Sequence, residues 1–382
     1  MTLRPLFING RFLTQEITGT QRYAHEIIDW LDAKLVESGA GWPEVAILVP
    51  SSDKLLPTYK AIQLKVVGAC SGRLWEQVEL PFYSRGGVLF TPCGGAPLIH
   101  PRSVVTIHDA GVFAIPGAYS FLFRLWYQFL YRAHCHTSLH VLTVSYASKY
   151  DLERYSGADP DKLSVTYLGA EHATRTTGLS GILEKYNLKR LGYVLIVGSR
   201  SPNKNLKGLL DAMALLGDGL RLVVVGKENE SVFGKRRTLK LPSHVLGLEH
   251  VSEAELHDLY GNAACFVFPS FYEGFGLPPL EAMAVGCPVV TSNTSALAEL
   301  FSTIAFVCDP EDPQDIAARI AEACLAGPEY RQSCRDFTSL FQWERCAKRT
   351  WELVAPYCMD EAGRGAAVRD LAWQSLTQSS TR

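Results

Sequence analysis

The stretch FVFPSFYEGFGLPPLEAMAVGCPVVTS, residues 266–292, carries the clearest indication of the fold class. It predicts, in order, a strand over Cys265–Phe268, a loop with Gly274 and Gly276, a helix that opens at Pro278 and Pro279 and ends at Gly286, and a strand over Val289–Thr291. Proline suits the first positions of a helix, and glycine followed by proline ends one. Both strands are continuous apolar runs, which is typical of parallel strands covered on both faces. The stretch is therefore one strand-helix-strand unit of an open α/β sheet.

Apolar runs of the same kind recur along both halves of the chain, with helical stretches between most of them. In the first half the predicted strands are Leu6–Ile8, Val45–Val49, Val88–Phe90, Val104–Ile107 and Val141–Val144. In the second half they are Tyr193–Val197, Leu222–Val225, Val245–Leu246, Cys265–Phe268, Val289–Thr291 and Ala305–Val307. Strands that alternate with helices form crossover units and doubly wound sheets.

The chain has 382 residues, more than one hydrophobic core usually serves. The polar segment Gly169–Gly192 interrupts the strand pattern and is interpreted as an interdomain linker. We expect Rossmann-like domains over residues 1–175 and 190–343, followed by a crossover helix and tail over 344–382. Ligands of open α/β sheets bind at the carboxyl ends of the strands, so two facing sheets should share a central cleft.

Composition is that of an ordinary globular enzyme, with 47% apolar and 20% charged residues. The net charge of -2 gives no support for a nucleic-acid partner. Ten cysteines without a C-x-x-C pair predict reduced thiols in a cytoplasmic protein. The N-terminal residues MTLRPLFING contain no apolar run of signal-peptide length, and no apolar run is long enough for a membrane span.

The loop and helix after Phe268 suit a ligand that carries phosphates. Free N–H groups at a helix start attract phosphate, and the two glycines allow close approach of the backbone. We expect Glu281, in the first turn of that helix, to accept hydrogen bonds from a ribose diol, as acidic residues do in dinucleotide sites. Glu273 is expected to hold sugar hydroxyls. The alternative for Glu281 is that it only complements the helix dipole.

A second segment, VLIVGSRSPNKNLKGLLDAMALL over residues 194–216, places two cations between a strand and a helix. Arg200 can bind phosphate oxygens bidentately, and Lys204 acts as a point charge. The pair can therefore neutralise a diphosphate. By itself such a pair is just as compatible with a solvated surface.

Together these segments resemble the retaining nucleotide-sugar glycosyltransferases of family 4, which have the GT-B fold. Glu273 and Glu281 match the E-x7-E signature of that family, and GSRSPNKN matches its diphosphate-binding segment. The resemblance extends from Phe7 to Trp343 through GLEHVSEAELHDLYGNAACFVFPS, DPEDPQDIAARI, FINGRFLTQEITGTQRYAHEI, LWEQVELP, VVTIHDAGVF and TVSYASKYDL. The stretch ALAELFSTIAFVCDP departs from the family pattern, which often has a proline before the glutamate and then a Gly-Asp-Ala-Ala turn. That departure bears on which nucleotide base is bound.

The resemblance implies a GT-B enzyme whose C-terminal helices pack back toward the N-terminal domain. Its catalytic residues would be His108, Arg200, Lys204 and Glu273. Its donor-binding residues would be Gly19, Ser199, Gly274, Phe275, Gly276, Leu277 and Glu281. Its acceptor-side residues would be Asn9, Arg22 and Asp109. Front-face attack with retention requires no protein nucleophile, and protein cations would take the place of a metal cofactor.

The implied reaction moves a mannose- or rhamnose-type hexose from a GDP-linked donor to a growing, lipid-linked glycan of an O-antigen or cell-surface polysaccharide. It would take place in the cytoplasm, at the inner face of the plasma membrane. Two other functions stay open: a sugar-nucleotide 2-epimerase of the same fold, and an inactive subunit that only binds sugar nucleotides. Glycoside hydrolysis is disfavoured, because Glu281 opens a helix beside a phosphate cradle instead of facing a second carboxylate across a substrate site.

The stretch FLFRLWYQFLYRAHCHTSLH, residues 121–140, holds three histidines and Cys135. A metal site is disfavoured, because no separate Cys/His pair completes zinc spacing. An amphipathic helix explains the stretch better. Its apolar side chains either pack into the core, which is the favoured interpretation, or contact a membrane.

Overall fold

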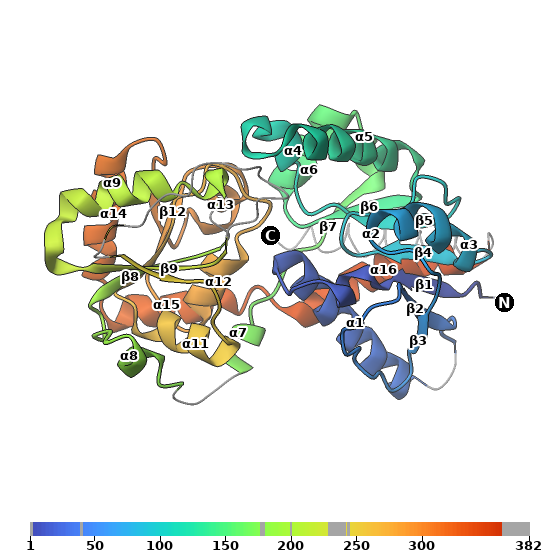
Figure 1. Ribbon diagram of the computed structural model, residues 1–382, viewed down its shortest axis with the longest axis horizontal. Coiled ribbons are helices and arrows are strands. Elements are labelled where there is room, and N and C mark those ends of the chain that lie inside the picture. The colour runs from blue at the N-terminus through green and yellow to red at the C-terminus, as the bar shows by residue number, and fades with distance from the viewer. Residues whose placement is uncertain are drawn as a thin grey trace, which may run out of the picture.

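The computed structural model describes residues 3–38, 41–175, 180–198, 201–227, 242 and 245–360. Within them, two parallel sheets form two lobes joined side by side (Figure 1). The first sheet has the order β3-β2-β1-β4-β5-β6-β7 and the second β10-β9-β8-β11-β12-β13. Numbered from its own first strand, the second sheet has the order 3-2-1-4-5-6 of a doubly wound nucleotide-binding fold, and the first sheet adds one strand to that order.

The strands of the first sheet are β1 Leu6–Asn9, β2 Val45–Val49, β3 Gln63–Val66, β4 Val88–Thr91, β5 Ser103–Thr106, β6 His140–Thr143 and β7 Leu163–Val165. Those of the second are β8 Tyr193–Val197, β9 Arg221–Val225, β10 Val245–Leu248, β11 Cys265–Phe268, β12 Val289–Ser292 and β13 Phe306–Cys308. All neighbouring strands in the two sheets pair in parallel.

Helices and short helical turns connect the strands. In the first lobe they are η1 Gly10–Thr14, α1 Gly19–Glu37, α2 Gly72–Leu74, η2 Trp75–Glu79, α3 Leu80–Tyr83, α4 Gly111–Ala114, η3 Pro116–Ala118, α5 Phe121–Thr137, α6 Tyr146–Ser156 and η4 Pro160–Lys162. Later in the chain they are α7 His172–Arg175, α8 Ile182–Lys185, η5 Pro202–Lys204, α9 Leu206–Leu216, η6 Gly217–Gly219, α11 Glu253–Asn262, α12 Leu277–Ala284, α13 Ser295–Phe301, α14 Pro313–Cys324, α15 Pro328–Thr338 and α16 Trp343–Cys358.

Both faces of the second sheet are covered, which explains its continuous apolar strands. In β8, Val194 and Ile196 pack in one cluster with residues of α9 and α14, whereas Tyr193 and Leu195 belong to a second cluster with residues of α11 and α12. Alternate side chains of a strand point to opposite faces. Every β8 side chain thus finds an apolar partner, whichever way it points.

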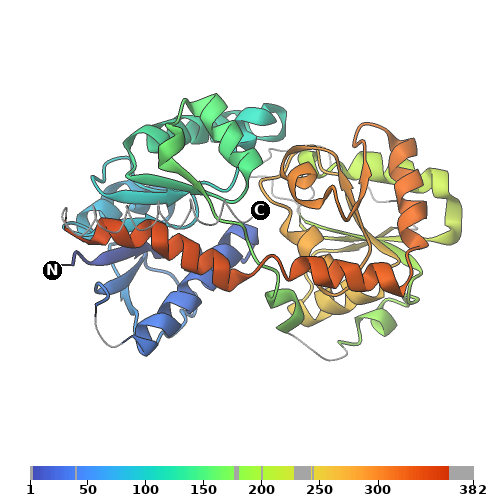
Figure 2. The ribbon, with the colours of Figure 1, turned by 180° about the vertical axis from the view of Figure 1, so that it is seen from behind.

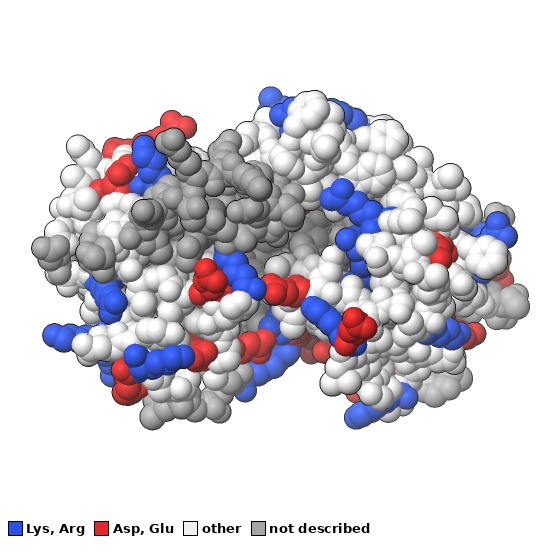
Figure 3. Space-filling view, in the orientation of Figure 1, with Lys and Arg blue, Asp and Glu red and all other residues white. Residues whose placement is uncertain are grey.

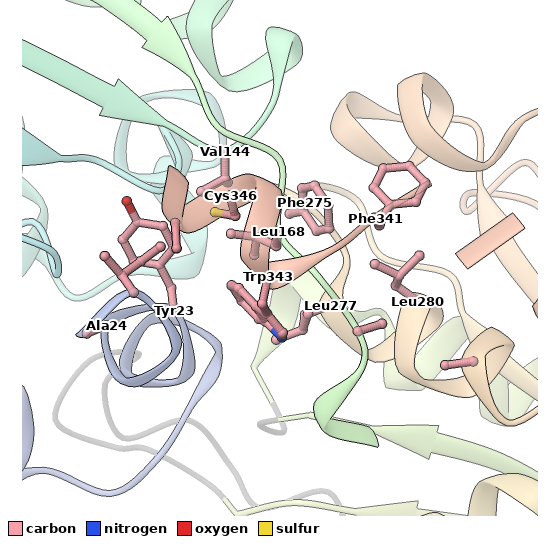
Figure 4. Packing of buried hydrophobic residues seen from close by; sticks show 14 of the residues in the cluster. Tyr23, Ala24, Val144, Leu168, Phe275, Leu277, Leu280, Phe341, Trp343 and Cys346 are labelled. Atoms are coloured by element: carbon pink, nitrogen blue, oxygen red, sulfur yellow. The ribbon is translucent and has the colours of Figure 1, made fainter. Parts of the chain in front are cut away.

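The second cluster runs without a break from one lobe to the other. Tyr23 and Ala24 of α1 belong to it, as do Leu277 and Leu280 of α12. Figure 4 shows Trp343 between these two groups, where the lobes join. The lobes are therefore joined by apolar packing as well as by the chain itself.

Helix α16 returns the chain to the first lobe, as expected from the resemblance. It follows α15, which packs on α12 of the second lobe, and it lies along α1 and beside β4 of the first (Figure 2). The backbone N–H of Arg4 donates to the carbonyl oxygen of Cys358 at 2.8 Å, which fastens the far end of the helix. The predicted domain limits at residues 175 and 190 stay predictions, since the strands place the first crossing only between Val165 and Tyr193.

The strand predictions failed at two places in the first lobe. β3 was missed because it is a mostly exposed strand at the end of the sheet with little apolar signal, and β7 because it has only three residues. In the second lobe all six predicted runs are strands, with β13 shifted by one residue at each end.

Candidate active site

Loops that follow strands of both sheets meet between the lobes. His108 and Asp109 follow β5, and the loop with Gly274 follows β11. A Cβ atom at Gly274 would lie 2.4 Å from the carbonyl oxygen of His108 and 2.8 Å from the Cβ atom of Asp109. The two loops are therefore in contact, and only glycine fits at position 274.

Lys204 forms the central ion pair of this region. Its Nζ atom lies 2.7 Å from Oε1 of Glu273 and 4.5 Å from the centre of the Phe268 ring. The side chains of Lys204 and Glu273 are only 16% and 13% exposed. The backbone N–H of Glu273 also donates to Oγ of Ser295 at 2.9 Å, which fixes the loop. A partly buried cation of this kind can bind a phosphate group if one displaces or joins Glu273.

Asp109 faces this ion pair from the first lobe. Burial raises the pKa of its carboxyl group, and the nearby carboxylates of Glu273 and Asp151 add to the effect. The backbone N–H of Gly111 donates to its Oδ1 atom at 2.7 Å and holds the side chain in place. The carboxyl group of Asp109 is thus close enough to Lys204 and Glu273 for their charges to act on it.

His108 is held as a neutral donor. Its Nε2 atom lies 2.9 Å from the carbonyl oxygen of Pro92, which can only accept a hydrogen bond, so the proton is on Nε2. Burial lowers the pKa of His108 to about 4. The edge of its ring meets the Tyr23 ring at 5.0 Å between centroids. His108 is therefore uncharged at neutral pH.

Glu281 is not in the first turn of its helix, as the sequence led us to expect. Gly276 takes a φ of 104° and starts α12 at Leu277, before both prolines, so Glu281 is the fifth residue of the helix. Glycine adopts such a φ readily because it has no side chain. The sequence does not show which glycine does so, and the two prolines suggested a later start for the helix. The carboxylate accepts hydrogen bonds from Nε2 of His172 at 2.8 Å and from the hydroxyl of Tyr260 at 3.0 Å.

Burial by itself would raise the pKa of Glu281. The hydrogen bonds from His172 and Tyr260 and the positive charge of Arg22 outweigh burial and hold this pKa below its ordinary value. Glu281 is therefore ionised at neutral pH. Each carboxylate oxygen has a second lone pair, so the bound carboxylate can still accept hydrogen bonds from a ligand.

The starts of two helices, one from each lobe, lie next to each other. A Cβ atom at Gly19, the first residue of α1, would lie 3.8 Å from Leu277, the first residue of α12. Leu277 and Phe275 are themselves buried, and Phe275 packs against Tyr167 and Phe341. These two predicted donor-binding residues can therefore offer a donor their backbone but not their side chains.

The predicted acceptor-side residues other than Asp109 are engaged elsewhere. Asn9 is buried, donates to Oε1 of Glu76 at 3.1 Å, and accepts from the backbone N–H of Arg11 at 3.2 Å. Arg22 pairs with Glu253 and so links α1 to α11 across the lobes. Their acceptor roles stay predictions. Ser199 and Arg200 lie outside the described residues.

Several polar contacts that join the lobes had no signal in the sequence. Oγ of Ser145 donates to the carbonyl oxygen of Gly274 at 2.7 Å. Glu299 of α13 accepts from the backbone N–H groups of Tyr146 and Ala147, at 3.0 and 2.6 Å, and so caps α6 of the first lobe. The partners are more than a hundred residues apart in sequence, so only the folded chain brings them together.

The three histidines of residues 121–140 turn away from a common centre. The Nε2 atoms of His134 and His136 lie near the carbonyl oxygens of Ala96 and Ser156, and that of His140 lies near the hydroxyl of Ser164. Each histidine thus has a partner of its own. Among the described residues, no three His, Cys, Asp or Glu side chains gather as a metal site would need.

Helix α5 carries an exposed apolar face, contrary to the favoured expectation of core packing. Leu122 is 78% exposed and Phe121 63%, and Leu125 and Phe129 on the same helix are also exposed. Arg124 lies over the ring of Phe121, 5.6 Å from its centroid. No described helix combines the length and apolarity needed to cross a bilayer.

Charge on the surface is mixed where the described residues can be seen. On the face shown in Figure 3, Asp and Glu side chains lie among Lys and Arg side chains along the lower part of both lobes, and a group of Lys and Arg side chains stands beside the hollow on the first lobe.

Comparison with known proteins agrees with this architecture. Residues 183–338 match the family model of glycosyl transferases group 1. The chain is 33% identical over 267 residues to O-antigen chain mannosyltransferase B of Escherichia coli, an alignment that covers 65% of this chain and 69% of the relative. It is 31% identical over 219 residues to O-antigen chain mannosyltransferase RfbU of Salmonella typhimurium, covering 56% of this chain but only 59% of that relative.

Among solved structures, the fold is similar to that of sucrose-phosphate synthase from Thermosynechococcus elongatus. The TM-score is 0.71 at 19% identity, covering 92% of this chain and 98% of the other. At such identity the likeness concerns the fold alone, which is the GT-B fold of two facing Rossmann-like lobes. Matching sequence over most of a relative, together with the two doubly wound sheets, places this chain in the family of group 1 glycosyl transferases.

Proposed function

We propose that this chain is a retaining hexosyltransferase that uses a GDP-linked mannose- or rhamnose-type donor and extends a lipid-linked glycan of an O-antigen or surface polysaccharide. The observation that carries the proposal is the ion pair of Lys204 and Glu273 where the loops of the two lobes meet. Similarity to the two O-antigen mannosyltransferases supports the choice of sugar and acceptor.

In the proposed reaction, an acceptor hydroxyl attacks the anomeric carbon from the face on which the diphosphate leaves. The bond from the anomeric carbon to the phosphate oxygen breaks, and the hydroxyl proton passes to the leaving diphosphate. Lys204 and the start of α12 stabilise the charge that develops on the phosphates, as preorganised donors and dipoles do. Glu273 holds sugar hydroxyls, and Glu281 holds the ribose.

Protein cations take the role that a divalent ion has in other sugar-nucleotide enzymes. Lys204 supports this because it lies partly buried beside the carboxylate of Glu273 in the family signature, with Arg200 as the second cation expected from the sequence. We therefore expect transfer to continue in the presence of a chelator. Loss of transfer in EDTA, with recovery on adding Mg²⁺ or Mn²⁺, would contradict this part of the proposal.

A peripheral contact with the inner face of the plasma membrane fits the lipid-linked acceptor. The exposed face of α5 formed by Phe121, Leu122, Leu125 and Phe129, with Arg124 beside it, has the apolar and basic groups of an interfacial helix. We place the membrane against this face. The enzyme would then meet its acceptor at the lipid surface while it takes its donor from the cytoplasm.

Thermal unfolding of the purified chain with GDP, UDP or dTDP tests the donor. We expect GDP to raise the melting temperature most, because a nucleotide that binds only the folded state stabilises it. Stabilisation by UDP alone would refute the GDP assignment. In the same assay, Glu281→Ala should reduce the rise in melting temperature caused by GDP. In a separate incubation of the sugar nucleotide without acceptor, no epimer should form.

A further inference from the structure

Glu281 is connected to the interdomain crossings through a chain of hydrogen bonds. Nε2 of His172 lies 2.8 Å from Oε1 of Glu281, and Nδ1 of the same ring lies 2.9 Å from the indole nitrogen of Trp343. His172 and Trp343 are both buried. A buried polar chain of this kind rigidifies its members when every group has a partner.

The indole of Trp343 determines which ring nitrogen of His172 carries the proton. An indole N–H can only donate, so Nδ1 of His172 must accept and is unprotonated. The proton is therefore on Nε2 and points at Glu281. Trp343 thus orients a neutral donor toward the carboxylate that we expect to hold the ribose.

His172 and Trp343 stand on the two segments that cross between the lobes. His172 begins α7 within the first crossing, between β7 and β8, and Trp343 begins α16 at the second. The backbone N–H of Trp343 donates to both oxygens of Glu171, at 3.0 and 3.1 Å. A Cβ atom at Gly169 would lie 2.2 Å from the Trp343 nitrogen, so the two crossings are in direct contact.

We propose that His172 is a positioning residue for the nucleotide site: it ties the carboxylate of Glu281 to the point where both crossings meet. The inference rests on the proposed function, in which Glu281 binds the ribose of the donor. The hydroxyl of Tyr260 holds the other carboxylate oxygen from α11. Trp343, the first residue of α16, holds His172, and His172 holds Glu281. We therefore expect nucleotide binding to depend on the packing of α16 against the first lobe, although neither His172 nor Trp343 belongs to the E-x7-E signature.

Three substitutions of His172 separate its hydrogen bond from its bulk. His172→Gln keeps a donor at the place of Nε2, His172→Asn keeps an acceptor at the place of Nδ1, and His172→Phe keeps the ring alone. Calorimetric titration of the full chain with GDP, and with UDP and dTDP, should show about tenfold weaker binding for the Phe and Asn variants. The Gln variant should stay within about threefold of wild type.

Steady-state kinetics should separate the Gln variant of His172 from the Phe and Asn variants in the same way. We expect the donor KM to rise in the Phe and Asn variants while kcat changes less, because the reacting groups around Lys204 are untouched. Trp343→Phe should also weaken nucleotide binding, since it removes the group that fixes the His172 proton. His136→Gln, a change on α5 at a histidine bonded to the carbonyl oxygen of Ser156, is the matched control and should bind like wild type.

Different outcomes would contradict the role of His172 and the proposed function. Wild-type affinity in the Phe and Asn variants, or equal loss in the Gln and Phe variants, would overturn the role of His172 while leaving the enzyme a glycosyltransferase. A wild-type chain that binds none of the three nucleotides would overturn the proposed function and this inference together. Melting curves of the Gln and Asn variants show whether both are folded when they are compared.

Discussion

The Nζ atom of Lys204 lies 2.7 Å from Oε1 of Glu273, in a region that also holds the carboxyl group of Asp109. The ammonium group of Lys204 is paired with Glu273, and its charge also acts on the nearby carboxyl group of Asp109. An arriving diphosphate has to draw Lys204 away from Glu273 or share it. The ion pair thus keeps the cation oriented and ready for phosphate.

Replacing Lys204 should abolish most transfer. Lys204→Met removes the described cation nearest to Glu273, and losing one preorganised charge at a leaving group costs about 100-fold or more in turnover. The measurement is kcat/KM for the donor. Lys227→Met, which removes an exposed ion pair with Glu16, is the control and should stay near wild type. A Lys204→Met enzyme within twofold of wild type would refute the assignment.

Removing His108 should lower turnover more than nucleotide affinity. Its ring is held by the carbonyl oxygen of Pro92 after the end of β5, whereas we propose that Glu281 holds the ribose, so His108→Ala should reduce kcat while the Kd of GDP stays nearly constant. Since the pKa of His108 is about 4, its titration should not appear in a pH–rate profile above pH 5. An equal loss of kcat and GDP affinity would contradict the placement.

Adding one methyl group at Gly274 should disrupt the contact between the lobes. The new Cβ atom in Gly274→Ala would lie 2.4 Å from the carbonyl oxygen of His108, so the loops must move apart. We expect kcat to fall about tenfold or more, because a small displacement of reacting groups is costly. Gly261→Ala places its methyl group in open space within α11 and should be neutral or slightly stabilising. Equal activities of the two variants would contradict the prediction.

The folded chain should lose stability as the pH falls from about 6.5 toward 4. Burial lowers the pKa values of His108, His134 and His140 to about 4, from an ordinary value of 6.5. In this window the unfolded chain binds more protons at these histidines than the folded chain. Each therefore contributes up to about 1.4 kcal/mol of lost stability per pH unit.

Glu76 makes the opposite contribution to the pH dependence of the free energy of unfolding. Burial raises its pKa to about 7, so the folded chain holds a proton there that the unfolded chain releases. The three histidines together lower the free energy of unfolding between pH 6.5 and 4 by more than this one carboxyl group raises it. Urea denaturation at several pH values measures the balance, and His140→Asn should make the dependence shallower by about one proton. A free energy of unfolding that does not change between pH 6.5 and 5 would refute the prediction.

The exposed face of α5 should bind anionic lipid surfaces. Replacing Phe121 and Leu122 with glutamate removes apolar area and adds negative charge, so co-sedimentation with phosphatidylglycerol vesicles should fall at least severalfold. Leu325→Glu alters an equally exposed leucine in the second lobe and is the control. If the α5 variant and wild type sediment equally, the membrane does not meet this face.

Much of the fold could be predicted because buried parallel strands are continuous apolar runs. The six strands of the second lobe all gave this signal, whereas β3 is mostly exposed and gave almost none. The signature residues were found as well, but their surroundings were not. Glu281 meets His172 across 109 positions, and His172 meets Trp343 across 171, and no local pattern predicts such pairs.

Local geometry was the other source of error. The helix of the signature starts at Leu277 because Gly276 adopts a left-handed backbone, whereas the prolines suggested a later start. The apolar residues of α5 were expected in the core, yet Phe121 and Leu122 face outward. A helical period alone does not say which side of a helix the rest of the molecule covers.

The contact of Gly169 with Trp343 has a mechanical consequence. Because the two covalent connections between the lobes touch at this point, we expect any rigid rotation of one lobe to pivot near it. Atoms beside the pivot travel least and those at the outer rim travel farthest. If Glu281 binds the ribose, the ribose end of a donor would therefore move little when the lobes rotate. The sugar end, which lies farther from the rotation axis, would move more.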